Sequence, residues 1–226
     1  MITRRSALAG LSAGLSAGFL AAAHPLGRPA AAQDVDIPDP EVGEPVVARR
    51  VPGELAERAL ALPALVPAGA VGGDVVFVEF FDYNCPYCRA SAAHIAPLVA
   101  RPGVGVLLAN YPILSDASRE AAAIALGVLA LAGPEAYLPF HAALFASRGL
   151  VDGARALDVA QAQGLDPDAL GRAAALPGID PAIEDILQVG RVLGFDATPS
   201  TLVGPWAYEG YLTHARKERI VADLRA

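Results

Sequence analysis

The sequence is poor in several residue types, and each scarcity excludes a class of protein. Its 226 residues include two cysteines, one methionine and one tryptophan. Basic residues are the minority, with 17 Lys and Arg against 24 Asp and Glu, which gives a net charge of −7. Nucleic-acid binders carry a basic surface, so we expect no nucleic-acid partner. Charged residues make up 18% and hydrophobic residues 54%, which argues against disorder and predicts a buried core.

Metal ligands and cofactor motifs are scarce as well. A zinc site usually has four ligands, and beside Cys85 and Cys88 the sequence has no second cysteine pair. His94, His141 and His214 lack paired ligand spacing, and we interpret His94 and His141 as structural or surface residues. No nucleotide, flavin or metal motif is present. We therefore expect neither a metal nor a cofactor, and half a zinc site stays as one alternative for the cysteines.

The N-terminus has the features of an export signal. Arg4 and Arg5 precede a weakly apolar stretch over residues 8–23, and Ala30 to Ala32 offer small residues for cleavage. Residues 1–32 therefore predict a twin-arginine-like signal peptide, cleaved near Ala32, and a periplasmic or otherwise exported protein. The alternatives are a general secretory signal and a retained anchor, although an apolar stretch of about 16 residues is shorter than the ~20 that a span needs. Without the signal, 14 basic residues face 24 acidic ones and the charge is −10.

Residues 33–73 precede the main domain that the pattern predicts. Residues 33–52 contain four prolines and no helical period, which indicates an extended linker outside the core. Residues 53–62 place apolar side chains on one helical face before Pro63, so we expect a short helix there.

Residues 74–226 predict an α/β domain with a helical insertion. The runs 75–81 and 104–110 are apolar on both faces, as in buried parallel strands, and a helix beginning near Cys85 and kinked or ended by Pro97 makes a βαβ unit with them. From about 115 to 194 we expect about five short helices, broken at sites such as Gly133-Pro134. The end of the chain predicts a hairpin of strands 200–203 and 207–211 and a helix from Thr213.

The segment Cys85-Pro86-Tyr87-Cys88 indicates redox chemistry. A helix N-terminus stabilises a thiolate, so Cys85 in the first turn is the expected nucleophile, and Pro86 suits a position with no N–H partner to lose. Cys88 lies one turn further in and is the expected buried resolving thiol. A static structural disulfide and two inert buried thiols are alternatives. A disulfide across only two intervening residues closes a small loop and would constrain the unfolded chain little.

Three separated features resemble DsbA-like thiol-disulfide oxidoreductases of the thioredoxin superfamily over residues 74–226. They are the segment EFFDYNCPYCR over 79–89, the run Ala197-Thr198-Pro199 before a late strand, and the helical insertion between them. The resemblance implies a thioredoxin fold with an inserted helical subdomain and an enzyme that exchanges disulfides with proteins. It does not distinguish an oxidase from an isomerase or a reductase.

The resemblance also implies site residues. Pro199 is expected to be cis and to pack against the active-site disulfide, with Thr198, Pro86 and Tyr87 lining the substrate groove; an ordinary trans turn proline is the alternative. Glu79, an acid in an apolar strand six residues before Cys85, is expected to be buried and to exchange protons with the resolving thiol. The alternative is a strand-end glutamate that faces solvent.

The favoured function is the formation of disulfides in exported protein substrates, with a membrane redox partner. The first alternative is an isomerase or reductase that such a partner keeps reduced, although 33–73 is short for the dimerisation module of an isomerase. An exported chaperone or binding module is the alternative from a different class, and a small-molecule transferase is a third.

Overall fold

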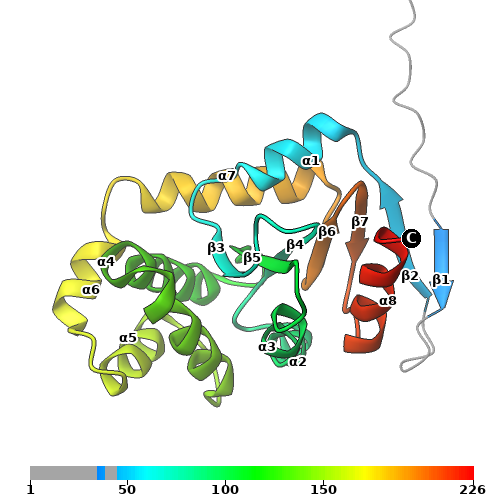
Figure 1. The fold of residues 1–226 in the computed structure, drawn as a ribbon. Coiled ribbons are helices and arrows are strands. Elements are labelled where there is room, and N and C mark those ends of the chain that lie inside the picture. The colour runs from blue at the N-terminus through cyan, green and yellow to red at the C-terminus, as the bar shows by residue number, and fades with distance from the viewer. Residues whose placement is uncertain (1–34, 39–44) are drawn as a thin grey trace, which may run out of the picture. The chain divides into compact units, whose positions relative to one another are not determined.

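A computed structural model describes residues 35–38 and 45–226, which fall within one compact unit (Figure 1). The predicted signal peptide, residues 1–32, lies outside the described residues. The strands are β1 (Val35–Pro38), β2 (Pro45–Arg50), β3 (Val66–Gly69), β4 (Val75–Phe81), β5 (Val104–Asn110), β6 (Ser200–Val203) and β7 (Trp206–Glu209). The helices are α1 (Gly53–Leu60), α2 (Pro86–Ala92), α3 (Ile95–Val99), α4 (Asp116–Ala146), α5 (Gly153–Ala162), α6 (Pro167–Ala174), α7 (Ile179–Val192) and α8 (His214–Leu224).

The seven described strands form one sheet in the order β1-β2-β7-β6-β4-β5-β3. Strands β4 and β5 are parallel and are connected through α2 and α3, so the predicted βαβ unit is confirmed. The other described strand pairs are antiparallel, including the predicted hairpin of β6 and β7, in which Val203 pairs with Trp206. This topology places the end of β4, where the cysteines follow, in the interior of the sheet between β6 and β5.

The prediction that residues 33–52 form a linker outside the core is wrong for the part that the structure describes. Strand β2 pairs with β7 through Ala48 and Tyr208, and Val46 and Ala48 are buried in the core. Strand β3 was not predicted, because it is only four residues long and contains a proline. It pairs antiparallel with β5 at one edge of the sheet.

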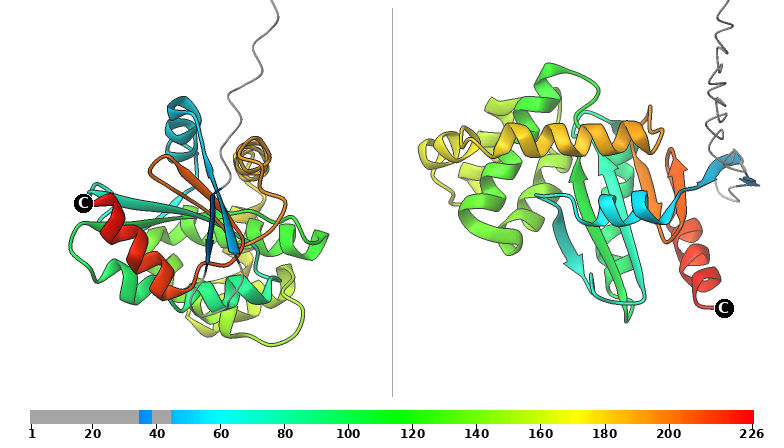
Figure 2. Two further views of the ribbon diagram at one scale, coloured as in Figure 1. Left: turned by 90° about the vertical axis from the view of Figure 1, so that its right-hand side faces the viewer. Right: turned by 90° about the horizontal axis from the view of Figure 1, so that it is seen from above.

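Helices cover both faces of the sheet. Figures 1 and 2 show α1 and α7 side by side over one face and α2, α3 and α8 over the other. Strand β4 reflects this division: Val78 and Phe80 belong to the core cluster under α1 and α7, whereas Phe77 and Phe81 belong to the cluster on the opposite face. Alternate residues of a strand point to opposite faces, so Glu79 lies on the face of α2 and α8.

Helices α4, α5 and α6 form the inserted helical region between β5 and the end of the chain (Figure 1). The helix α4 is kinked at Gly133, where φ is 76° and ψ is −179°, so the expected break at Gly133-Pro134 is confirmed. Among the described helices, α4 alone is long and apolar enough to cross a membrane, but its buried side chains, such as Phe140 and Leu144, join the core. The fold is therefore the predicted thioredoxin fold with an inserted helical subdomain.

Candidate active site

Both cysteines lie at the start of α2. Cys85 is the N-cap residue, with extended backbone angles of −86° and 121°, and Pro86 occupies the first turn, where a proline loses no hydrogen bond. Both are free thiols; Cys85 is 5% exposed and Cys88 is 1% exposed. The predicted helix ends at Ala92, before Pro97. Pro97 instead lies inside the next helix, α3, which begins at Ile95.

Each sulfur has a backbone partner. When protonated, the Cys85 thiol donates to the carbonyl oxygen of Thr198 at 3.0 Å, and the N–H of Asp82 donates to the Cys88 sulfur at 3.5 Å. The first contact connects residues 113 positions apart in the chain. The Thr198–Pro199 peptide bond is cis, as the resemblance predicts.

The two thiols have very different acidities. A hydrogen bond from Cys88 lowers the pKa of Cys85 to about 6, against the effect of burial, and the Thr198 side chain and the Tyr87 and Cys88 N–H groups act in the same direction. Burial raises the pKa of Cys88, and the Cys85 sulfur raises it further. Near neutral pH, Cys85 is therefore a thiolate while Cys88 keeps its proton.

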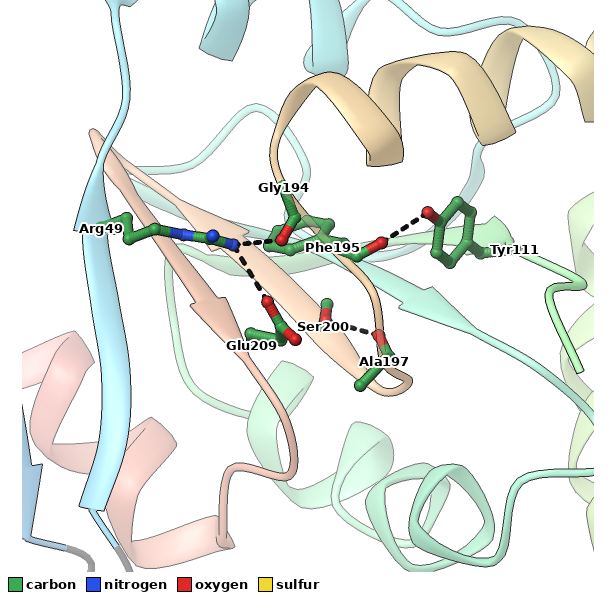
Figure 3. Close-up of polar contacts among 7 residues, drawn as sticks. All are labelled: Arg49, Tyr111, Gly194, Phe195, Ala197, Ser200 and Glu209. Carbon is green, nitrogen blue, oxygen red and sulfur yellow. Dashed lines mark hydrogen bonds and ion pairs between the residues drawn. The ribbon is translucent and has the colours of Figure 1, made fainter. Parts of the chain in front are cut away.

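The loop before β6, which carries Thr198 and Pro199, is fixed from two sides (Figure 3). Arg49 of β2 donates to the Gly194 carbonyl and also pairs with Glu209 at 3.1 Å. Tyr111 donates to the Phe195 carbonyl at 2.8 Å from the other side.

At the end of this loop, Ser200, the first residue of β6, donates to the Ala197 carbonyl at 2.7 Å (Figure 3). These hydrogen bonds fix the loop, so the position of the Thr198 carbonyl beside Cys85 is fixed as well.

Glu79 is 3% exposed, which confirms burial and excludes the alternative of a solvent-facing glutamate. Lys217 of α8, 1% exposed, donates to its carboxylate at 2.6 Å and to Ser91 of α2 at 2.8 Å. Burial raises the pKa of Glu79, but the charge and hydrogen bond of Lys217 outweigh it and hold that pKa below its ordinary value. Glu79 is therefore an ionised carboxylate, and Lys217 connects it to the redox helix through Ser91.

The turn between β4 and α2 is anchored residue by residue. The Asp82 carboxylate accepts hydrogen bonds from the N–H groups of Asn84, at 2.8 Å, and of Leu114, at 3.0 Å. Asn84 donates to Ser118 of α4 at 3.0 Å and exchanges two hydrogen bonds with the backbone of Val151, at 2.8 and 2.9 Å.

Tyr83, between these two residues, shares hydrogen bonds of 3.1 Å with Tyr137 and with His141. Burial lowers the pKa of His141 to about 4, so this histidine is a neutral part of the network, in keeping with the structural role expected for it.

Several of these residues escaped the sequence analysis. A buried Glu79 called for a basic partner, but nothing in the spacing identified Lys217, which is 138 positions away. Asn84 and Asp82 are common turn residues, so their long-range contacts left no signal in the sequence.

Of the predicted groove residues, Thr198 is buried, whereas Pro86 and Tyr87 are exposed. Within residues 35–38 and 45–226, no three His, Cys, Asp or Glu side chains gather as a metal site requires.

This geometry can be set against known proteins. A family model described as thioredoxin matches residues 66–223, which is more than half of the chain. The chain belongs to the thioredoxin family. No match was found among curated proteins.

Solved structures narrow the assignment to DsbA-like members. A thioredoxin-like oxidoreductase from Silicibacter pomeroyi DSS-3 is 33% identical, with a TM-score of 0.70 over 75% of this chain and 96% of that one. The thiol-disulfide exchange protein alpha-DsbA2 from Wolbachia pipientis is 25% identical, with a TM-score of 0.70 over 76% and 92%. A periplasmic thioredoxin-like protein from Salmonella enterica serovar Typhimurium is 25% identical, with a TM-score of 0.65 over 79% and 100%.

This DsbA-like thioredoxin is an enzyme, a thiol-disulfide oxidoreductase whose redox pair is Cys85 and Cys88. The acidities of the two sulfurs suit that chemistry, because a thiolate at Cys85 is both a nucleophile and a good leaving group.

Proposed function

We propose that the protein oxidises thiols of exported protein substrates to disulfides. The observation that carries the proposal is the lowered pKa of Cys85, about 6. A stabilised Cys85 thiolate favours the reduced form of the pair, and a couple whose reduced form is stabilised is a strong oxidant.

The reaction balances as two exchange steps. A substrate thiolate attacks the Cys85 sulfur of the oxidised enzyme, the Cys85–Cys88 bond breaks, and Cys88 leaves and takes up a proton. A second substrate thiolate then attacks the substrate sulfur of the mixed disulfide, and Cys85 leaves as a thiolate. The substrate loses two electrons and the enzyme gains them, so a membrane redox partner must withdraw two electrons to restore the disulfide.

Other site residues support this chemistry. In the proposal, Pro199 and Thr198 shape the groove that receives the substrate chain, and Pro86 and Tyr87 form its exposed side. Glu79 assists proton movement at Cys88: Lys217 keeps its carboxylate ionised, so it acts as the base that takes the Cys88 proton when the membrane partner restores the disulfide.

The expected export of the protein supports oxidation, rather than reduction, of its substrates. Disulfides persist outside the cytoplasm, and the solved relative from Salmonella enterica is described as periplasmic. The proposed domain order is a signal peptide over 1–32 followed by the DsbA-like domain. We place the start of that domain before residue 74, because β2 and β3 belong to its sheet, and we limit the helical insertion to α4, α5 and α6, because α7 covers the sheet beside α1. In this proposal, signal cleavage near Ala32 releases the mature enzyme.

The test is the equilibrium reduction potential of Cys85 and Cys88 in purified mature protein, titrated against glutathione with thiol trapping. We expect a potential well above the roughly −270 mV of thioredoxin, toward the roughly −120 mV of DsbA. A potential near that of thioredoxin would favour the reductase or isomerase alternative. If the protein were a binding module or chaperone, the Cys85→Ser variant would still act on its clients. If it is an oxidase, that variant must lose its activity.

A further inference from the structure

The segment Ser147–Val151, here called the strap, joins α4 to α5 and is tied to the redox motif at both ends. Arg89, directly after Cys88, donates to the Ser147 carbonyl at 2.6 Å. Asn84, directly before Cys85, exchanges hydrogen bonds of 2.8 and 2.9 Å with the backbone of Val151. The strap therefore lies against the two residues that flank Cys-Pro-Tyr-Cys.

The middle of the strap is open to solvent although its ends are held. Arg148, Gly149 and Leu150 are exposed, and Gly149 turns the chain with a φ of 81°. Val151 is fully buried and fixes the end of the strap in the core. An exposed leucine on a loop that is anchored in this way contributes little to packing.

Leu150 and Tyr87 are the two most exposed large hydrophobic side chains among the described residues, each at 62%. Both belong to segments that adjoin Cys85: Tyr87 lies inside the redox motif, and Leu150 is one residue from the hydrogen bonds to Asn84. An exposed apolar group on a segment that adjoins a reactive centre is typical of a binding surface for another molecule.

A client has to occupy this surface during the reaction. In the mixed disulfide the client cysteine is covalently bound to Cys85, so the residues next to that cysteine run over the protein surface beside it. The strap is hydrogen-bonded directly to the side chain of Asn84, the residue before Cys85. An extended chain advances about 3.3 Å per residue, so only a few client residues separate the bound cysteine from the strap.

We propose that the strap is a client-docking element, in which Leu150 contacts an apolar side chain of the client within a few residues of its reactive cysteine. The inference rests on the proposed exchange with protein substrates and names the chemistry that the site selects. The partner is an extended polypeptide with an apolar residue close to a cysteine. A small thiol cannot reach the strap.

The test compares two dithiol peptides that differ only in a leucine or a serine two residues from one cysteine, with dithiothreitol as the small-thiol reference. Second-order rate constants for reduction of the oxidised enzyme are measured for each. We expect the unaltered enzyme to react about tenfold faster with the leucine peptide, since burial of a leucine side chain supplies that much binding. In Leu150→Ser, we expect the rate ratio of leucine peptide to dithiothreitol to fall about five- to tenfold.

Leu176→Ser is the matched control, because Leu176 is 50% exposed in the turn after α6 and has no contact with the redox turn among those described. Its rate ratio should match that of the unaltered enzyme. Leu150→Phe should keep the preference for the leucine peptide, which separates loss of apolar contact from damage to the loop.

An unchanged ratio in Leu150→Ser would overturn the proposal. A fall of the peptide and dithiothreitol rates by the same factor, with a shifted reduction potential, would also overturn it, because the strap would then support the cysteines rather than the client. Failure of the unaltered enzyme to react with any dithiol is a different result, since it would reject the proposed oxidase itself.

Discussion

At the scale of single residues, the unequal acidity of the two thiols is the property that most directly governs the chemistry. With the pKa of Cys85 lowered to about 6, we expect the rate of alkylation by iodoacetamide to rise with pH around a midpoint near pH 6. Only one thiol should react below pH 8, because Cys88 stays protonated. The measurement is mass spectrometry of the alkylated protein, and Cys85→Ser should abolish the fast reaction. A midpoint near pH 8.5 would contradict the interpretation.

The Thr198 side chain offers a second prediction at this scale. Its hydroxyl is buried and has no hydrogen-bond partner among the described residues, so it is available to the Cys85 thiolate, and the Thr198 side chain helps to lower the pKa of Cys85. Thr198→Val removes the hydroxyl and keeps the shape, so the alkylation midpoint should rise by about one pH unit. Thr198→Ser retains a hydroxyl and should keep the low midpoint. An equal shift in both variants would mean that packing, not the hydroxyl, matters.

At the scale of elements, the ion pair of Glu79 and Lys217 joins three parts of the fold. It connects the central strand β4 to α8, and through Ser91 to the redox helix α2. Lys217→Met would leave Glu79 buried without its counter-charge, so the free energy of unfolding should fall by about 3–5 kcal/mol. Urea denaturation measures the change.

The matched control for this prediction is the double variant Glu79→Gln with Lys217→Met. It removes the buried charge as well as its partner, so most of the lost stability should return. If the double variant were as unstable as Lys217→Met alone, the loss would come from packing around the lysine stem rather than from the unpaired carboxylate.

The elements also show which parts of the fold were readable in the sequence. Strands β4 and β5 were predicted with their observed bounds, because long runs that are apolar on both faces have few other interpretations. Strand β2 was misread as linker because prolines surround it, and the buried residues Val46 and Ala48 alternate over too few positions to give a clear period. The partner of Glu79 depends on the packing of α8, which no local pattern encodes.

At the scale of the whole molecule, the thiolate links stability to pH in the reduced protein. The pKa of Cys85 is about 6 in the folded state and about 8.5 in an unfolded chain. A lowered pKa contributes stability that is complete above the unfolded value and is lost as the pH falls through the folded value. We therefore expect the free energy of unfolding of the reduced protein to rise from pH 6 to pH 8 relative to Cys85→Ser.

Urea denaturation at several pH values in excess reductant measures this dependence. The buried Cys88 acts oppositely above pH 8.5, where only the unfolded chain ionises it, so the comparison stays below that pH. A flat difference between the two proteins would show that Cys85 has an ordinary pKa in the fold.

The anchoring of the turn has a consequence for protein engineering. Asp82, Tyr83 and Asn84 each bond to a different segment outside the βαβ unit: the loop after β5, the second half of α4, and the strap. The Cys-Pro-Tyr-Cys motif therefore depends on the helical insertion for its conformation and cannot be transferred alone. Grafted into a thioredoxin that lacks the helical insertion, residues 79–92 would bring the cysteines but would leave two of these three anchors without their partners.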